Sequence, residues 1–200
     1  MSRTITYYLA LISPFTYLGH DRLRAMAKAQ GAAIDYRPID IMAVFKETGA
    51  VPPVQRHPNV QAYRGAELRR WSARLGLPLT AKPRFFPVPL GLASGLVMAA
   101  GDAGVDAGAV AGACLRAVWA EDRDISDAAT LAAIATEQGL DAPAMMAAAA
   151  APAMAERLAA NTRQALDTGV FGSPTYCLGN EIFWGQDRLD MLEDALAARY

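Results

Sequence analysis

The stretch Ile12-Ser13-Pro14-Phe15-Thr16-Tyr17-Leu18 decides the fold, because an apolar run ends there and a helix begins. Residues Ile5–Ile12 are apolar and rich in aromatic and β-branched side chains, which is typical of a buried strand. Ser13 is a favourable N-cap, and the fixed φ angle of Pro14 suits the first position of a helix. The stretch therefore predicts a strand that passes directly into a helix.

The residues that follow extend this start into a pair of parallel strands. Apolar side chains recur at helical spacing up to about Gln30, and Gly31 is a typical helix stop. Ala33–Pro38 then predicts a second strand. A helix that joins two strands over this distance is typical of a βαβ unit, in which the strands are parallel and the crossover is right-handed.

The C-terminal part of the sequence predicts a hairpin and a closing helix. Thr175–Leu178 and Glu181–Trp184 flank Gly179-Asn180, a two-residue turn that suits positive φ angles. Asp187–Arg199 predicts a helix whose leucines face the sheet. Just before the hairpin, Gly172-Ser173-Pro174 places a proline at a strand start, where its missing N–H is tolerated.

The middle of the chain, residues 41–161, shows no strand signal. Stretches rich in alanine, leucine and arginine alternate there with glycine and proline, which indicates an inserted helical domain. The predicted helices are Val60–Leu75, Leu92–Ala100, Gly108–Glu121, Ser126–Gln138, Pro143–Ala149 and Pro152–Thr168.

Composition and charge exclude several classes of protein. With 53% hydrophobic residues, the 200-residue chain can bury a sizeable core. Its 19 basic and 20 acidic residues leave a net charge of -1, so no nucleic-acid partner and no anionic membrane surface are expected. The uncharged stretch 85–100 is broken by proline and glycine and is shorter than the roughly 20 residues that span a bilayer.

The reactive side chains are too few for a disulfide framework or a metal cluster. Cys114 and Cys177 are far apart and stand among apolar residues, and His20 and His57 are equally scattered. We therefore expect two reduced core cysteines and no metal. Because the N-terminus also shows no signal-peptide pattern, a cytoplasmic protein is the simplest expectation.

The motifs resemble a known family when they are taken together. Three of them, Ser13–Leu18, Gly169–Thr175 and Phe183–Asp190, are similar to the kappa-class glutathione transferase branch of the thioredoxin superfamily. Two further stretches, Tyr36–Met42 and Leu75–Pro78 with Phe85-Phe86-Pro87, resemble the 2-hydroxychromene-2-carboxylate isomerase family within that branch.

This resemblance implies an α/β protein with a thioredoxin-like fold and a large all-α insertion. The thioredoxin-like domain is discontinuous, formed by residues 1–40 and 162–200, and residues 41–161 form the helical insertion domain. In this superfamily the first helix begins opposite a cis-proline loop, so the bond between Ser173 and Pro174 is expected to be cis.

The resemblance also places a reaction at Ser13. Disulfide oxidoreductases of this superfamily carry two cysteines at the first helix start, whereas Ser13 and Thr16 stand here, so dithiol exchange at these positions is chemically impossible. A hydroxyl and a helix N-terminus can instead stabilise the thiolate of a bound glutathione. An ordinary N-cap remains the alternative interpretation of Ser13.

The expected glutathione site combines charges with backbone pairing. Ser173 and Pro174 would pair with the cysteinyl backbone, Gln186 would add a donor, and Asp187 and Arg188 would hold the charged ends of glutathione. Kappa-class transferases typically carry asparagine where Ala50 stands, which leaves backbone pairing from Val51. Asp187 could equally be a helix cap and Arg188 a solvated surface charge.

For the substrate, Arg84 beside Phe85 is the first candidate to hold an aromatic carboxylate, and Lys46 is the second, although either could be a plain surface charge. The family resemblance implies interconversion of 2-hydroxychromene-2-carboxylate and trans-o-hydroxybenzylidenepyruvate. A homodimer is the default expectation, because closed twofold dimers are the commonest oligomers. Two alternatives stay open: a kappa-class transferase acting on electrophiles, and a binding or chaperone module without catalysis.

Overall fold

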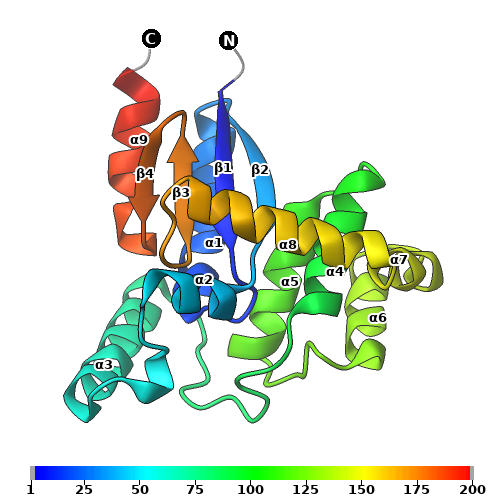
Figure 1. Cartoon of the computed structure of the whole chain (residues 1–200), viewed down its shortest axis with the longest axis horizontal. Coiled ribbons are helices and arrows are strands. Elements are labelled where there is room, and N and C mark those ends of the chain that lie inside the picture. Colours follow the sequence, from blue (N-terminus) through cyan, green and yellow to red (C-terminus); the bar gives the residue numbers. More distant parts are fainter. Residues whose placement is uncertain (1–2, 199–200) are drawn as a thin grey trace.

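Four strands form one mixed sheet in the computed structural model, which describes residues 3–198 (Figure 1). Their order is β2-β1-β3-β4, with β1 parallel to β2 and antiparallel to β3. The predicted βαβ unit and the C-terminal hairpin are both confirmed by this pairing. The strands are β1 Thr4–Leu9, β2 Ala33–Pro38, β3 Thr175–Leu178 and β4 Glu181–Trp184.

The first strand ends earlier than its apolar run predicts. β1 stops at Leu9, and the next residues turn because the Ser13 amide donates to the Ala10 carbonyl at 2.9 Å. The Ala10 amide is bound by the Ser173 hydroxyl at 2.8 Å, so it does not continue the strand ladder. The prediction of a strand to Ile12 was therefore wrong, since these residues are buried by a turn and not by a sheet.

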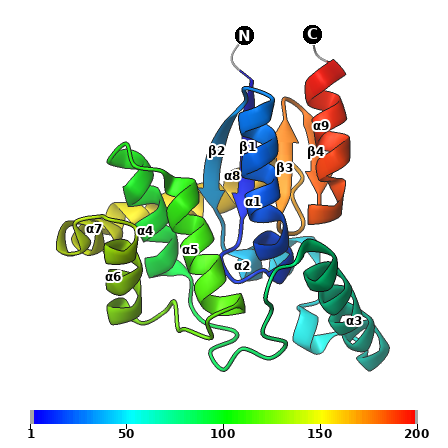
Figure 2. The ribbon, with the colours of Figure 1, turned by 180° about the vertical axis from the view of Figure 1, so that it is seen from behind.

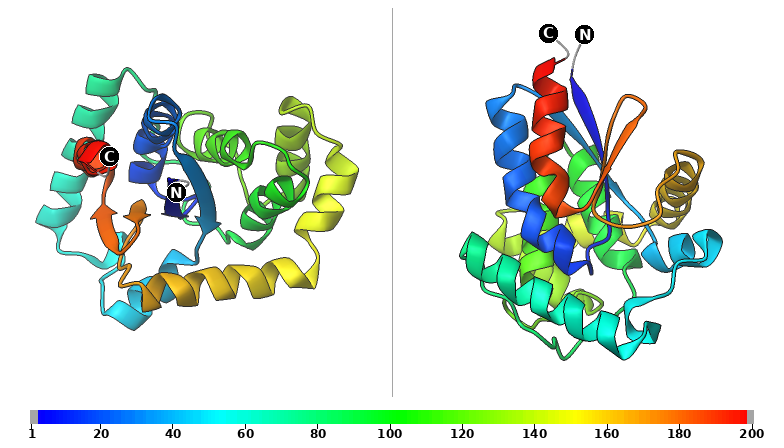
Figure 3. Two further views of the ribbon diagram at one scale, coloured as in Figure 1. Left: turned by 90° about the horizontal axis from the view of Figure 1, so that it is seen from above. Right: turned by 90° about the vertical axis from the view of Figure 1, so that its left-hand side faces the viewer.

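Helices cover both faces of the sheet. Figure 3 shows α1 (Pro14–Ala29) and α9 (Leu189–Ala198) on one face and α8 (Pro152–Asp167) across the other, and Figure 2 shows the first face directly. Adjacent residues of β1 serve the two faces: Tyr7 belongs to the larger core cluster and Tyr8 to the smaller one. The layers on both sides bury the centre of the sheet.

The predicted helical insertion is present, and most of its helices gather beside β2. α4 to α7 form this group, while α3 stands on the opposite side of the molecule (Figure 1). The insertion helices are α3 Pro58–Leu75, α4 Gly91–Asp102, α5 Ala107–Trp119, α6 Ala128–Glu137 and α7 Ala142–Ala149. The expected domain boundary between residues 161 and 162 falls inside α8, and this division stays a prediction.

Three short elements were not predicted. α2 (Ile41–Thr48) begins at Asp40, whose carboxylate accepts from the Met42 and Ala43 amides, and it ends at Gly49 with φ 70°. The other two are the 3-10 turns η1 (Pro53–Gln55) and η2 (Gln186–Arg188). The sequence does contain the start signal of α2, Asp40, and its stop signal, Gly49. Only eight residues separate them, which is too short a stretch to show a clear helical pattern.

The predicted closing helix also differs at its start. Its first residues form η2, and the α-helix begins at Leu189 because the chain leaves β4 through Gly185 at φ 101°. The predicted end at Arg199 lies outside the described residues. Within residues 3–198, no helix is both long and apolar enough to cross a membrane, and no cluster of histidine, cysteine and acidic side chains has the make-up of a metal site.

Candidate active site

Ser13 caps the first turn of α1 and is half-buried. Its hydroxyl oxygen accepts from the Thr16 amide at 3.2 Å, as an N-cap does. The same hydroxyl donates to the Ser173 carbonyl oxygen at 3.0 Å. A single side chain therefore joins the helix start to the loop before β3, across 160 positions of sequence.

The loop before β3 has the expected cis peptide between Ser173 and Pro174. The Ser173 hydroxyl lies 2.9 Å from the hydroxyl of Thr16, which is fully buried, and accepts from the Ala10 amide. Ser173 was expected to pair with the backbone of a ligand, and in the structure its carbonyl oxygen accepts the hydroxyl of Ser13. The structure thus brings Ser13, Ser173 and Pro174 together, as predicted, and adds Thr16 to the group.

The contacts of Ser13 leave its hydroxyl able to serve an anion. Its one proton goes to a neutral carbonyl oxygen, and a hydrogen bond to a charged acceptor is about twice as strong. The start of α1 adds the partial positive charge of a helix N-terminus. A thiolate placed at this helix start could therefore take the Ser13 proton in place of the Ser173 carbonyl.

Neither cysteine of the chain can supply that thiolate. Cys114 and Cys177 are buried and free of disulfides. Burial raises the pKa of the Cys114 thiol to about 12 and that of the Cys177 thiol to about 11. Both thiols are protonated near neutral pH, so a reactive sulfur at Ser13 would have to arrive with a ligand.

Of the three residues predicted after the hairpin, one is buried and the other two form an exposed pair. Gln186 is 2% exposed, and Arg22 donates to its side-chain oxygen at 3.1 Å and to its carbonyl at 3.2 Å. Asp187 and Arg188 are exposed and pair with each other at 2.8 Å. Gln186 is therefore buried and its oxygens support Arg22, while its predicted role as a donor to glutathione stays a prediction.

The segment around Val51 offers one backbone group to a ligand. The Val51 carbonyl accepts from the Arg56 side chain at 2.8 Å, so the amide N–H is the group that remains for the predicted pairing. The side chain of Val51 is 49% exposed. Lys46, one of the two predicted substrate cations, is exposed in the last turn of α2.

Arg84 is tied into the loop that leads to α4. Its backbone amide and its Nε donate to the two carboxylate oxygens of Asp122, each at 2.7 Å, and its guanidinium lies 5.1 Å from the centre of the Phe85 ring. The backbone hydrogen bond from Arg84, followed by its side-chain bond, holds the pKa of Asp122 below the ordinary value. The charge of Arg84 is thus already compensated, and its role toward a substrate stays a prediction.

Tyr17 anchors the loop that follows α3 to the first turns of α1. It is buried, and its hydroxyl donates to the Pro78 carbonyl at 2.8 Å. Burial, reinforced by the charge of Asp21, raises the pKa of Tyr17, so the phenol remains a donor. This anchor was not predicted, because the contact depends on how residues 61 positions apart pack together.

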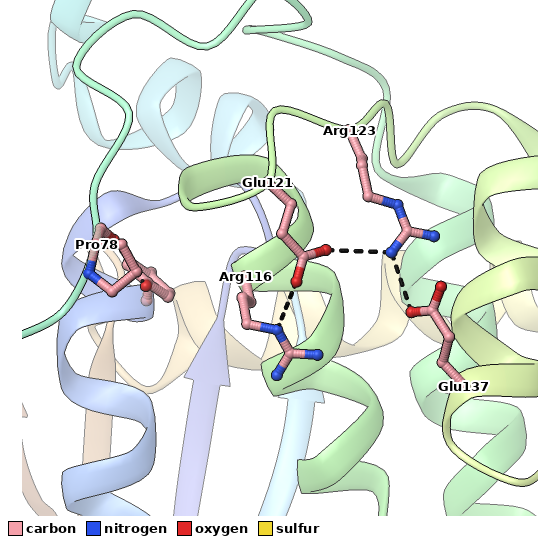
Figure 4. A network of polar contacts seen from close by, with 6 residues as sticks. Pro78, Arg116, Glu121, Arg123 and Glu137 are labelled. Atoms are coloured by element: carbon pink, nitrogen blue, oxygen red, sulfur yellow. Dashed lines mark hydrogen bonds and ion pairs between the residues drawn. The ribbon is translucent and has the colours of Figure 1, made fainter.

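Figure 4 shows Pro78 next to α1 and, beside it, an ion-pair network at the end of α5. Glu121 lies between Arg116 and Arg123, at 2.7 and 3.1 Å, and Arg123 also reaches Glu137 at 3.0 Å. Burial opposes the ionisation of Glu121, but hydrogen bonds from the two arginines outweigh it and lower its pKa. The network holds the end of α5 and the start of the next loop together.

Two hollows in the described residues, of about 620 and 360 Å³, are lined by neither Ser13 nor Ser173. The larger is lined mainly by charged and small side chains of α1 and β2, and the smaller by apolar residues of α4, α7 and α8. In the larger hollow the side chains of Arg24 and Asp106 already pair with each other. We place the candidate active site at Ser13, where a hydroxyl donor stands at the start of α1, and not at either of these two hollows.

Comparisons with known proteins match nearly the whole chain. The family model of the DSBA-like thioredoxin domain matches residues 4–197. The 2-hydroxychromene-2-carboxylate isomerase of Sphingobium xenophagum is 35% identical over 199 residues, which cover 98% of this chain and 99% of the relative. The whole length of the chain is therefore accounted for by one relative.

Solved structures give the same result. A structure of 2-hydroxychromene-2-carboxylate isomerase has a TM-score of 0.84 at 31% identity and covers 98% of this chain and 95% of that one. The cytosolic disulfide reductase DsbM of Pseudomonas aeruginosa, solved with GSH, has a TM-score of 0.70 at 18% identity, with 98% and 96% coverage. The predicted thioredoxin-like fold with its helical insertion is confirmed by these matches.

Proposed function

The chain belongs to the 2-hydroxychromene-2-carboxylate isomerases, whose fold is the DsbA-like thioredoxin domain, and from this we propose a glutathione-dependent isomerase. Its reaction would interconvert 2-hydroxychromene-2-carboxylate and trans-o-hydroxybenzylidenepyruvate. The observation that carries the proposal is the contact group of Ser13, Thr16 and Ser173. In this group Ser13 and Thr16 place hydroxyls at the two positions where a dithiol enzyme needs cysteines.

The residues present fit glutathione as the cofactor. The chain's own thiols are buried and protonated, and a hydroxyl donor stands at a helix start, which suits a sulfur that comes with the ligand. The DsbM relative in fold was solved with GSH. We propose that glutathione is bound by Ser173 and Pro174, by the Val51 amide, and by the pair Asp187 and Arg188. Gln186, which is bonded to Arg22, would hold the neighbouring pair Asp187 and Arg188 in place.

When bound, glutathione supplies a thiolate that adds reversibly to the conjugated carbon of the ring-opened substrate, so that a double bond becomes a rotatable single bond. The Ser13 hydroxyl would donate a hydrogen bond to the sulfur. Together with the start of α1, this bond would favour the thiolate over the thiol. A cation near the substrate's pyruvyl end stabilises the negative charge that develops there. Lys46 and Arg84, with the ring of Phe85 as a wall, are the predicted residues for this role.

The experiment follows the absorbance of 2-hydroxychromene-2-carboxylate with and without glutathione. We expect conversion only when glutathione is present, and an unchanged glutathione concentration at the end. A kappa-class transferase would consume glutathione, and a binding module would convert nothing. Conversion at the same rate without glutathione would remove the cofactor from the proposal but leave the isomerase.

Glutathione also bears on where the protein works. The cofactor is useful only as a thiol, and the cytoplasm is the compartment that keeps thiols reduced. We therefore propose a cytoplasmic enzyme.

A further inference from the structure

Arg64 combines partial burial with a position against α1. It lies on α3, half-buried, with its guanidinium 5.9 Å from the centre of the ring of Phe15, the second residue of α1. No carboxylate of the described residues comes within ion-pair distance of it. By contrast, ion pairs with an acid are formed by arginines that include Arg22, Arg24, Arg37, Arg70, Arg84, Arg116, Arg123, Arg157 and Arg188.

The surroundings of Arg64 disfavour its charge. Burial lowers the pKa of the Arg64 guanidinium, and the positive charge of Arg56 lowers it further. Arg56 itself donates to the Val51 carbonyl. Two cations near each other, one of them partly removed from water, form an arrangement that an anion would stabilise.

The position of Arg64 specifies which kind of anion fits. The guanidinium lies over the ring of Phe15, two residues after Ser13 in the first turn of α1, and its planar fork matches the two oxygens of a carboxylate. Arg84 has its charge taken up by Asp122, whereas Arg64 has its charge available. We propose that Arg64 is a carboxylate-binding residue that holds the ligand at the start of α1.

This inference rests on the proposed function, in which two molecules bring carboxylates to Ser13. One is the substrate, whose flat ring could lie along Phe15, and the other is glutathione. Both offer the same chemical group to Arg64. The test therefore has one arm for each molecule, and both arms measure binding without turnover.

The test compares Arg64→Gln with Arg64→Lys, and uses Arg69→Gln as the matched control. Arg69 lies on the same helix, is exposed, and carries the same charge. Calorimetric titration gives the Kd of glutathione, and a second titration gives the Kd of 2-hydroxychromene-2-carboxylate. Loss of a hydrogen-bonded charge pair should weaken one of the two roughly tenfold to a hundredfold in Arg64→Gln.

The outcomes separate the sources of the carboxylate. Weaker binding of the chromene carboxylate alone assigns Arg64 to the substrate, and weaker binding of glutathione alone assigns it to the cofactor. Arg64→Lys keeps the charge without the fork and should recover part of the loss, and it also serves if Arg64→Gln does not fold. An equal loss in Arg69→Gln would mean a diffuse positive field of α3, and the proposal would be overturned.

Two further results are decisive. Unchanged Kd values for both ligands in Arg64→Gln would overturn the inference and leave the proposed isomerase standing. A wild-type protein that binds both ligands but converts nothing would refute the proposed function, while a loss of binding in Arg64→Gln would still support Arg64. A wild-type protein that binds neither ligand would overturn both.

Discussion

A hydroxyl group, that of Ser13, has two partners in the structure and is assigned a third in the proposed reaction. It caps α1 through the Thr16 amide and reaches the Ser173 carbonyl. In the reaction it would give up the carbonyl and donate to sulfur, while the cap is retained. At the scale of a residue, the proposal therefore requires that the Ser13 hydroxyl donate its hydrogen bond to the thiolate in place of the Ser173 carbonyl.

The variant Ser13→Ala tests that choice. Loss of one charge-assisted hydrogen bond removes on the order of 1.5–3 kcal/mol, so turnover should slow by roughly one to two powers of ten. The pKa of the bound glutathione thiol, followed by thiolate absorbance, should rise. The start of α1 still favours the thiolate, so some activity should survive, and loss of the N-cap should reduce the free energy of unfolding by about 1 kcal/mol.

Thr16→Val is the matched control for this variant. The Thr16 hydroxyl also contacts Ser173, but it is fully buried and cannot reach a ligand. The control should lose stability and keep the thiol pKa of the wild-type protein. Wild-type turnover and an unchanged thiol pKa in Ser13→Ala would reduce Ser13 to a helix cap.

At the scale of elements, the insertion packs its helices through small residues. A Cβ added to Gly95 of α4 would overlap the backbone carbonyl oxygen of Ala149 at the end of α7. A backbone oxygen cannot turn aside as a side chain can, so α4 and α7 would have to separate. Gly91, at the start of α4, has nothing within 4 Å of the same position.

Gly95→Ala should therefore reduce the free energy of unfolding, by about 1–3 kcal/mol for an overpacked contact. Thermal denaturation should show this as a melting temperature lower by about 2–4 °C per kcal/mol. Gly91→Ala should melt at the wild-type temperature or slightly above it, because alanine is the better helix former. Equal melting temperatures for both variants would contradict the close contact.

A buried histidine makes the contact between α1 and α5 sensitive to pH. The Nε2 of His20 lies 2.8 Å from the Gly108 carbonyl of α5, so it carries the proton. Burial lowers the pKa of His20, and the hydrogen bond to Gly108 opposes this only in part. Below the unfolded value of about 6.5 the unfolded chain therefore binds the extra proton first, and the free energy of unfolding falls as the pH decreases.

Urea denaturation at pH 8 and pH 5 measures this loss. The wild-type protein should lose stability between the two values, and His20→Gln should be less stable at pH 8 but lose less on acidification. His57→Gln is the control, since His57 is exposed at the start of α3. A stability change of equal size in His20→Gln and the wild type would exclude His20 as its source.

Elements with a complete local signal could be predicted, and those that depend on distant partners could not. The βαβ unit and the hairpin follow from local motifs, and the cis bond at Ser173 was implied by the family resemblance. The end of β1 could not be predicted, because it depends on the Ser173 hydroxyl taking the Ala10 amide. The interior position of Gln186 depends in the same way on Arg22, which comes from a helix far away in sequence.

The candidate site was predicted to a similar extent. Ser13 and Ser173 were expected together and lie together. The pairing of Arg84 with Asp122 could not be foreseen, since Asp122 lies 38 positions further along the chain. Arg64 has no sequence signal of its own among the arginines of α3, and only its packing against Phe15 distinguishes it.

At the scale of the whole molecule, glutathione should stabilise the folded state by mass action. A ligand that binds only the folded protein at 100 times its Kd adds about 2.7 kcal/mol to the free energy of unfolding. Millimolar glutathione should therefore raise the melting temperature. Arg188→Ala should reduce this rise with little change in the melting temperature without ligand, because its ion pair with Asp187 is exposed.

Arg163→Ala, an exposed arginine of α8, is the control for the thermal experiment. It should show the full wild-type rise. A rise of wild-type size in Arg188→Ala would return Arg188 to an ordinary surface charge. No rise in the wild-type protein would count against the whole glutathione site.

The assembly of the protein stays a prediction, and light scattering tests it. We expect the mass of two chains in solution, since closed twofold dimers are the commonest oligomers. Trp184 at the end of the outer strand β4 and Phe171 in the loop before β3 are both exposed, with their rings edge to face and the ring centres 4.8 Å apart, and such a dimer could cover them. A monomer mass at micromolar concentration would contradict this prediction.

The two buried cysteines have a consequence for oxidative stress. Peroxides and alkylating agents attack accessible thiolates, and Cys114 and Cys177 offer none near neutral pH. Damage would therefore fall on the cofactor pool before it reached the protein. The proposed enzyme would lose activity when reduced glutathione is exhausted, and would recover it, with its cysteines unmodified, once reduced glutathione is restored.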